Sequence, residues 1–230
     1  MERSSYVAEP DWLSATDFGQ LRDLGTQRTL PAGATLFVEG DEPYDLMLIE
    51  SGDIKLTTIA INGSETLLDV LGAGEVLGEL SAIDGEPRSA TAVALTPVEL
   101  VSIPVGRFLE FLQANPTSMG SLLAVTVRRL RLANRRQLEY STADALGRVC
   151  ARLDELVDRY GNVDDPDATE GDGVRIDLPI TQTELAQWCG LSREAVVKAL
   201  RKLRNLGWIT TADGVVTVED RRALRQRAAL

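Results

Sequence analysis

The sequence predicts an α+β fold in three parts: an antiparallel β domain, one long helix, and a smaller domain of helices that ends in a β-hairpin. Short apolar runs separated by glycines predict the β domain over residues 28–105. An unbroken helical pattern predicts the long helix from about residue 116 to residue 140. Two short helices that meet at Gly190, with a hairpin after them, predict the smaller domain. The domain boundaries that follow are 1–115, 116–142 and 143–230.

The β domain comes after a short helical segment at residues 11–26, in which Phe18 and Leu21 belong to one apolar face. Turn residues recur about every 8–12 positions, which is typical of an antiparallel sandwich or barrel with roughly eight strands. The clearest strand segments are residues 46–49, 54–57, 66–70, 91–94 and 98–101.

The long helix carries one face whose positions alternate in steps of four and three residues: Leu123, Val127, Leu130, Asn134 and Gln137. This spacing is typical of a coiled-coil seam with a polar residue at one position, so the helix is expected to pair with a second copy. A helix packed against its own domain has the same period, and the sequence pattern leaves both readings open.

A further helix is expected from about Ala143 to Tyr160, followed by an acidic, glycine-containing segment at residues 161–173. The spacing of that segment does not match a calcium-binding EF-hand loop, and a proline lies inside it. A solvated loop is therefore the expected structure.

Composition excludes several classes of protein. The chain has no histidine, the usual ligand of zinc and haem and the usual general base. Cys150 and Cys189 are too few for a four-thiolate iron–sulfur cluster, so no metal, haem or cluster is expected. Without a nucleophile elbow or metal-ligand spacing, the chain is not expected to be an enzyme.

The sequence also bears on location. No run of apolar residues is long enough to span a membrane, and the N-terminus lacks the pattern of a signal peptide. Two well-separated cysteines in apolar helical segments indicate a reducing compartment, so a cytoplasmic protein is expected.

Charge is unevenly distributed. Residues 1–120 carry 6 Lys/Arg against 19 Asp/Glu, whereas residues 180–230 carry 9 against 5. A nucleic-acid backbone binds to a local basic region of a protein. The net negative charge of the whole chain therefore does not exclude DNA binding.

The basic region contains a helix-turn-helix pattern. Thr181 and Glu184 form a capping box at the start of the first helix, and Gly190 permits a tight turn. Ser192 caps the second helix, which is expected to run from Arg193 to about residue 206.

The second helix exposes side chains that suit a DNA groove: Arg193, Glu194, Lys198, Arg201 and Lys202. Arginine and lysine can donate to guanine, and glutamate can accept from cytosine. The hairpin of residues 208–218 follows as a wing. Double-stranded DNA is therefore the expected partner.

A second constellation lies in the β domain. The turn at Gly78, Glu79 and Leu80 is followed, within the same acidic domain, by Arg88 and Ser89. Backbone amides and an arginine can hold one phosphate, whereas a carboxylate accepts from hydroxyls but repels a second anion. This combination favours a small ligand that carries both a phosphate and sugar hydroxyls.

Together these features resemble the cyclic-AMP receptor protein/FNR superfamily of bacterial transcription regulators, also called catabolite activator proteins. The resemblance covers nearly the whole chain and rests on the glycine-punctuated strands, residues 78–80 and 88–90, the long helix, residues 144–148 and residues 192–194. It implies an N-terminal cyclic-nucleotide-binding antiparallel β-roll, a dimerisation helix and a C-terminal winged helix-turn-helix. It also implies a homodimer that responds to a cyclic nucleotide and binds a near-palindromic operator.

The resemblance implies a role for each residue of the β-roll site. Arg88 would pair with the cyclic phosphate, and Ser89 would donate its hydroxyl and amide. Glu79 would accept the ribose 2′-hydroxyl, and the backbone of Gly78 and Leu80 would line the ribose.

In the DNA-binding domain, the resemblance implies that Arg193, Glu194 and Lys198 read bases in the major groove. Gln182 and Ser192 would hold phosphates. Lysine at position 198, where the family often has arginine, lacks the bidentate geometry, so preference at that base is expected to be softer.

The base of the nucleotide is less well specified. Two positions of the long helix that carry adjacent threonine and serine in the cyclic-AMP receptor are Ala133 and Asn134 here. Asn134 can donate and accept hydrogen bonds toward a base, and Ala133 can do neither. Cyclic AMP is the leading expectation, and cyclic GMP remains open.

The N-terminus has no cysteine cluster of the FNR type, and the lack of histidine argues against haem sensing. Two readings within the family remain. The protein is either a cyclic-nucleotide sensor or a member without ligand control, in which the β-roll is only a scaffold. A regulatory subunit acting on a protein partner is a third reading, which the helix-turn-helix disfavours. RNA polymerase is an additional possible partner.

Overall fold

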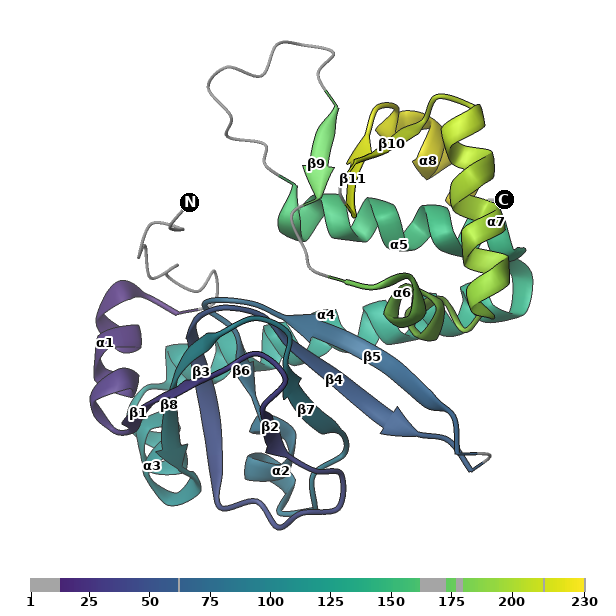
Figure 1. Cartoon of the computed structure of the whole chain (residues 1–230). Helices are drawn as coiled ribbons and strands as arrows, with labels where there is room; N and C mark the ends of the chain where they lie inside the picture. The colour runs from purple at the N-terminus through teal and green to yellow at the C-terminus, as the bar shows by residue number, and fades with distance from the viewer. Residues whose placement is uncertain (1–12, 62, 162–172, 177–179, 213, 230) are drawn as a thin grey trace. The chain divides into compact units, whose positions relative to one another are not determined.

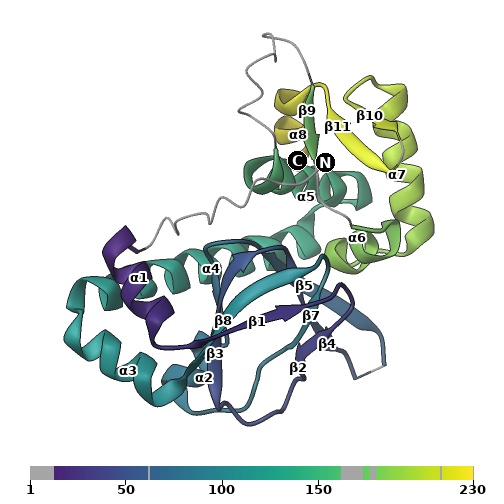
Figure 2. The ribbon, with the colours of Figure 1, turned by 60° about the vertical axis from the view of Figure 1, so that its left-hand side comes forward.

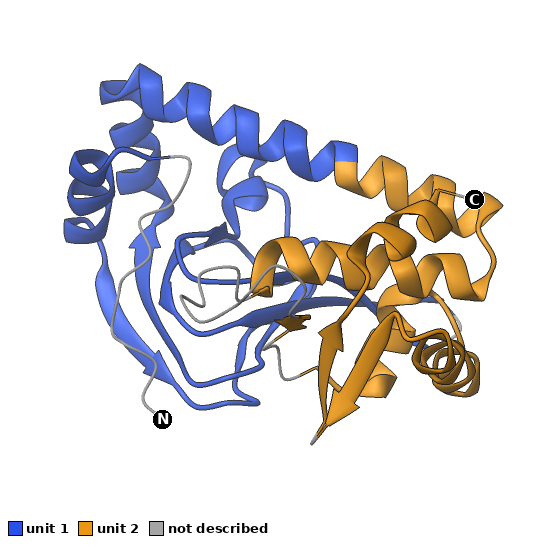
Figure 3. Cartoon of the chain, turned by 90° about the horizontal axis from the view of Figure 1, so that it is seen from above, with its two compact units in different colours: residues 1–131 blue, residues 132–230 orange. Residues whose placement is uncertain are grey.

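The computed structural model describes residues 13–61, 63–161, 173–176, 180–212 and 214–229 (Figure 1). The chain forms two compact units, residues 1–131 and 132–230, which are coloured separately in Figure 3. The acidic segment that was weighed as a calcium loop lies, apart from its two end residues, outside the described residues.

The first unit is a β-roll. Its elements are α1 (Ala15–Asp23), β1 (Thr26–Leu30), β2 (Thr35–Phe37), β3 (Asp45–Ser51), β4 (Ile54–Ile59), β5 (Glu65–Leu71), β6 (Val76–Leu77), α2 (Glu79–Asp84), β7 (Thr91–Ala94), β8 (Val98–Pro104) and α3 (Val105–Ala114). The strands form two four-stranded sheets, in the orders β1-β8-β3-β6 and β2-β7-β4-β5. All described pairings are antiparallel, which confirms the predicted class of fold.

Strand β3 shows how the core of the roll is built. Side chains of a strand alternate between the two faces of its sheet, and in β3 both sets are buried. Leu46 and Leu48 join the cluster with α1, α3 and the start of α4, the helix that follows α3. Met47 and Ile49 join the cluster between the two sheets. Figure 2 shows α1 and α3 on one side of the roll.

Helix α4 spans Pro116–Thr142, in agreement with the predicted long helix. Its N-terminal half belongs to the β-roll unit and its last turns belong to the second unit. On the N-terminal half, Leu122 and Val125 are buried in the roll, whereas Leu123 and Leu130 are exposed. The predicted seam is therefore a separate face from the one that packs on the roll.

The second unit is a winged helix-turn-helix. Besides the end of α4 it comprises α5 (Ala145–Tyr160), β9 (Val174–Ile176), α6 (Gln182–Cys189), α7 (Arg193–Asn205), β10 (Ile209–Ala212), β11 (Val215–Val218) and α8 (Arg221–Ala228). The three strands pair in the order β10-β11-β9. The wing is thus one strand wider than the predicted hairpin.

Helix α8 was not expected from the sequence, because its segment is rich in arginine and has one buried apolar residue, Leu224. Ion pairs to α5 hold it in place. Arg221 meets Asp154 at 2.6 Å, and Arg227 meets Asp144, the N-cap of α5, at 2.5 Å. The helix is therefore an integral part of the second unit.

We expect Leu224→Ala to lower the free energy of unfolding by about 2–4 kcal/mol, because it removes a fully buried side chain and leaves a cavity. Urea unfolding followed by tryptophan emission measures the change. Gln226→Ala, an exposed change on the same helix, is the control and should have little effect. Equal stability of the two variants would contradict the docking of α8.

Candidate ligand site and nucleic-acid interface

Arg88 is the centre of the candidate ligand site. Its side chain is buried, with 3% of the residue exposed. Nη1 donates to the carbonyl oxygen of Gly78 at 3.1 Å, and Nη2 donates to the carbonyl of Asp45 and to its Oδ1 at 3.0 Å. The guanidinium also lies over the ring of Phe37, 4.4 Å from its centroid. Nε has no hydrogen-bond partner among the described residues.

Burial and the neighbouring carboxylates shift the pKa of Arg88 in opposite directions. Burial lowers the pKa of Arg88, and the carboxylates of Asp45, Asp41 and Glu79 act against that shift. The guanidinium stays protonated, since arginine does not lose its proton in proteins. The result is a buried cation that requires an anion beside it.

Gly78 is required by this geometry. Its φ of +82° lies in the left-handed region, and a Cβ at this position would collide with Nη1 of Arg88. The glycine precedes α2, so it brings the backbone of residues 78–80 next to the guanidinium.

Glu79 is buried and is held by Arg129 of α4. The Nη1 atom of Arg129 lies 2.5 Å from Oε1 of Glu79, and its Nη2 atom donates to the carbonyl of Val76 at 3.0 Å. This ion pair offsets part of the charge of Glu79, since Arg129 also pairs with Glu75 at 3.4 Å, and it leaves Oε2 of Glu79 as an acceptor without a bond to Arg129. The negative charge near Arg88 is thereby reduced.

The structure brings Gly78, Glu79 and Arg88 together, as the sequence reasoning required. Ser89 follows Arg88 and is exposed, as is the side chain of Leu80. Asn134 is exposed on the part of α4 that belongs to the second unit.

Three partners in this site were missed by sequence reasoning: Asp45, Phe37 and Arg129. A cavity of about 390 Å³ next to Arg88 is lined by Phe37 and Asp45, together with Arg28, Leu36, Asp41, Glu42, Tyr44 and Met47. Asp45 directly precedes the apolar run of β3, which is the one local signal that marks it. Arg129 lies in an arginine-rich helix and has no local signal that connects it to Glu79.

The helix-turn-helix has the predicted local chemistry. Thr181 Oγ1 accepts from the Glu184 amide at 3.1 Å, and Glu184 Oε2 accepts from the Thr181 amide at 2.9 Å. Gly190 has a φ of +62°, which permits the turn between α6 and α7. Ser192 caps α7 by accepting from the Ala195 amide at 3.2 Å.

Helix α7 buries one face and exposes the other. The buried side chains are Val196, Ala199, Leu200 and Leu203. Arg193, Glu194 and Lys198 are exposed at its N-terminal half, and Gln182 is exposed at the start of α6. Hydrogen bonds from its own backbone amide and from the Ser192 side chain lower the pKa of Glu194, so this residue is ionised at neutral pH.

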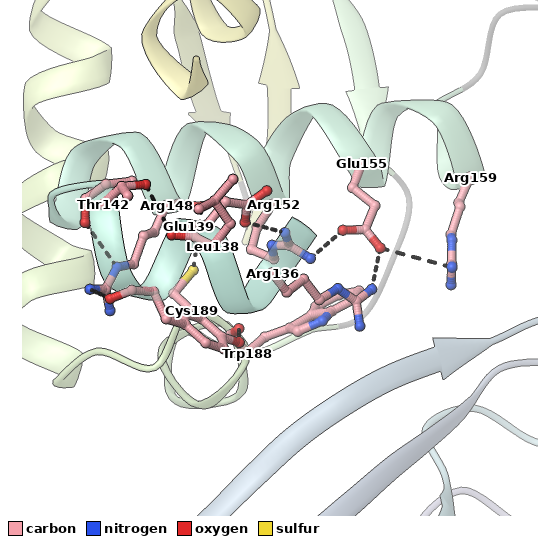
Figure 4. A network of polar contacts seen from close by, with 12 residues as sticks. Arg136, Leu138, Glu139, Thr142, Arg148, Arg152, Glu155, Arg159, Trp188 and Cys189 are labelled. Atoms are coloured by element: carbon pink, nitrogen blue, oxygen red, sulfur yellow. Dashed lines mark hydrogen bonds and ion pairs between the residues drawn. The ribbon is translucent and has the colours of Figure 1, made fainter. Parts of the chain in front are cut away.

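A network of buried and half-buried charges joins the last turns of α4 to α5 (Figure 4). Arg152 of α5 is buried and pairs with Glu139 of α4 at 2.7 Å and with Glu155. Glu155 also pairs with Arg136 of α4. The α4–α5 junction is therefore crossed by ion pairs in both directions.

The same network reaches α6 through Trp188, which is fully buried. The guanidinium groups of Arg136 and Arg152 lie 5.6 and 6.0 Å from its ring centroid (Figure 4). Tyr140 Oη donates to the Trp188 carbonyl at 2.9 Å. The first helix of the helix-turn-helix is thus attached to the end of α4.

Within the described residues, no group of three or more carboxylate or thiol side chains is arranged to hold a metal ion. Burial raises the pKa of Cys150 and of Cys189 to about 12, so both thiols are protonated at neutral pH. None of the described helices combines the length and the apolar character that crossing a membrane demands.

Family comparisons cover both units. The family described as cyclic nucleotide-binding domain matches residues 27–115, and the family described as Crp-like helix-turn-helix domain matches residues 147–227.

Curated relatives match over most of their length. The CRP-like cAMP-activated global transcriptional regulator of Mycobacterium tuberculosis is 35% identical over 198 residues, 86% of each chain. The cyclic AMP receptor protein of Thermus thermophilus is 31% identical over 202 residues, 88% of each chain. The Mycobacterium tuberculosis relative is a transcriptional regulator, which together with the helix-turn-helix family match confirms the prediction that the chain is not an enzyme.

Among solved structures, FixK2 from Bradyrhizobium japonicum has a TM-score of 0.76 at 18% identity and covers 90% of this chain and 98% of its own. The regulator CLP of Xanthomonas campestris has a TM-score of 0.73 at 22% identity, covering 89% and 99%. These two structures support the fold. The two family matches and the curated relatives show that the chain belongs to the cyclic-AMP receptor protein/FNR superfamily of DNA-binding transcription regulators.

Proposed function

We propose that the protein is a homodimeric transcription regulator whose binding to a near-palindromic operator responds to a cyclic nucleotide. The observation that carries the proposal is the buried guanidinium of Arg88, which has an unpartnered Nε and lies beside the Gly78 carbonyl and the ion-paired Glu79. The proposal places the protein in the cytoplasm, together with its DNA.

The phosphate of the ligand would bind at Arg88. A cyclic phosphate carries one negative charge, as does the Asp45 carboxylate that pairs with Arg88 in the structure. A buried cation favours any anion that can reach it, and Nε offers a donor that Asp45 leaves unused. Ser89, the next residue in the chain, is exposed and would add its hydroxyl and its backbone amide.

The ribose would bind at Glu79. Arg129 holds this carboxylate in place and offsets its charge, so it can accept the 2′-hydroxyl with little repulsion of the phosphate. The backbone of Gly78 and Leu80 would line the ribose. Asn134 would face the base, for which cyclic AMP is favoured by the curated relatives and cyclic GMP is the competitor.

The second copy would bind along the exposed face of α4. Leu123 is 64% exposed and Leu130 is 59% exposed, at positions of one seam in which Val127 lies between them. Burying such a row of apolar side chains against a second helix removes them from water. Twofold symmetry would then set the two α7 helices about 34 Å apart, which is one turn of DNA.

DNA would bind at α7. Arg193, Glu194 and Lys198 would read bases, and Gln182 and Ser192 would hold phosphates. The ion pairs of Arg152 and Arg136 attach the end of α4 to α5, and Tyr140 attaches it to α6 through the Trp188 carbonyl, so a shift of those turns would be carried to the helix-turn-helix. The nucleotide must bind the DNA-competent arrangement more tightly than the other one.

A member of the family without ligand control is the second candidate. The pairing of Arg88 with Asp45 favours it, because the cation already has an anion in the absence of a nucleotide. Equal binding of promoter fragments with and without cyclic AMP or cyclic GMP, in a gel-shift assay, would support this alternative. RNA polymerase is a proposed partner in either case.

We expect Arg88→Gln to abolish nucleotide binding, since it removes the cation that meets the phosphate. Arg88→Lys keeps the charge without the planar fork and should weaken binding without abolishing it. Titration calorimetry with cyclic AMP measures both variants, and Arg107→Gln, an exposed arginine of the same unit, is the control. Wild-type affinity in Arg88→Gln would overturn the site.

We expect Leu130→Glu to shift the protein from dimer to monomer, because a charge at the seam would have to be buried without a partner. Sedimentation velocity measures the shift. Ala124→Glu adds the same charge to an exposed position of α4 outside the seam and should leave the dimer intact. A Leu130→Glu dimer as stable as the wild type would place the dimer interface elsewhere.

We expect Arg193→Ala to cost about 1–3 kcal/mol on the specific operator and much less on random DNA, because base contacts are specific to sequence. Fluorescence anisotropy with both duplexes measures the difference. An equal loss on the two duplexes would show that Arg193 contacts the backbone alone.

A further inference from the structure

The exposed face of α7 contains one apolar side chain inside its charged part. Val197 is 39% exposed, whereas the other apolar residues in the middle of α7 are buried. Residues three and four positions apart are neighbours on a helix. Val197 therefore lies beside Glu194, Arg193 and Arg201, all of which are exposed.

Local helix chemistry does not explain this valine. A β-branched side chain loses rotamer freedom in a helix, so valine is a poorer choice there than alanine, lysine or glutamate. Val197 gains little burial in return, because the core of the second unit is filled by the opposite face of α7. Val197 therefore goes against helix propensity without a gain in packing, and such positions are expected at functional sites.

The major groove of DNA supplies an apolar partner. Its base edges are donors and acceptors, except for the C5-methyl group of thymine. A valine set against a donor or an acceptor would leave that group unsatisfied, whereas two methyl groups can pack on a third. The N-terminal residues of a recognition helix are the ones that contact base edges, and Val197 is the fifth residue of α7.

We propose that Val197 reads a thymine in each half-site of the operator by packing against its C5-methyl group. The inference rests on the proposed binding of DNA through α7, and it adds a specificity contact to the polar readers Arg193, Glu194 and Lys198. An A·T pair is then specified at the base step that Val197 faces, and it is specified by shape and not by a hydrogen bond.

The test uses duplexes that the wild-type protein selects from a random-sequence pool, with cyclic AMP present and, in parallel, absent. Each thymine of the selected site is replaced in turn by deoxyuridine, which lacks the methyl group and keeps the hydrogen-bonding pattern. We expect one thymine per half-site at which the replacement weakens wild-type binding by about fourfold, the equivalent of one buried methyl group at about 0.8 kcal/mol.

Variants assign that effect to the residue. Val197→Ala should bind the thymine duplex about as weakly as the wild type binds the deoxyuridine duplex, and should no longer distinguish the two. Val197→Thr keeps one methyl group and should keep the distinction. Leu206→Ala changes another exposed apolar residue, at the C-terminal end of the helix, and should distinguish the duplexes as the wild type does.

The outcomes distinguish a failure of the role of Val197 from a failure of the proposed DNA binding through α7. A selected site in which no deoxyuridine weakens wild-type binding overturns the role of Val197 while leaving DNA recognition intact. The same holds if Val197→Ala still distinguishes the duplexes as the wild type does. A pool with no enriched sequence contradicts DNA recognition through α7 itself.

Discussion

The first unit is organised by one buried positive charge. An unpaired charge in a protein interior costs several kcal/mol, so the start of β3, the turn before α2 and the ring of Phe37 meet around Arg88. This requirement explains the glycine at position 78, where a side chain would occupy the space of the guanidinium. It also supports the proposal of an anionic ligand at this place, because a buried arginine gains more from an anion than an exposed one does.

The second unit contains a buried arginine with a different role. Arg152 is engaged by Glu139 and Glu155, and Glu155 is shared with Arg136. These charges are matched within the protein, so they join helices and have no need of an outside anion. Arg88 has a single carboxylate partner, Asp45, and donates also to the backbone carbonyls of Gly78 and Asp45. One buried arginine is thus stabilised by ion pairs shared between helices, and the other largely by backbone carbonyls.

Local patterns in the sequence predicted most of the elements. The strand segments, the long helix that ends at Thr142 and the capping box at Thr181 and Glu184 are confirmed, because each is set by residues close together in the chain. Helix α8 was missed because its stability comes from Asp144 and Asp154, far away in sequence. In the site, Gly78, Glu79 and Arg88 were identified from a short motif, whereas Asp45 and Arg129 reach it from 43 and 50 residues away. The proposed ligand and DNA roles of these residues remain predictions.

Strand β3 is expected to be one of the most rigid parts of the first unit. This strand is paired on one side with β8 and on the other with β6, and both of its faces are buried. Its amides are of the kind that exchange with solvent only when the whole domain opens. Asp45, the first residue of β3, therefore holds Arg88 from a rigid support, whereas Gly78 holds it from the start of a helix of 6 residues with Leu80 and Ile83 exposed. If the proposed phosphate replaces Asp45 as the partner of Arg88, we expect the displacement to fall on α2 and on the Glu79–Arg129 pair, with the sheet as the fixed part.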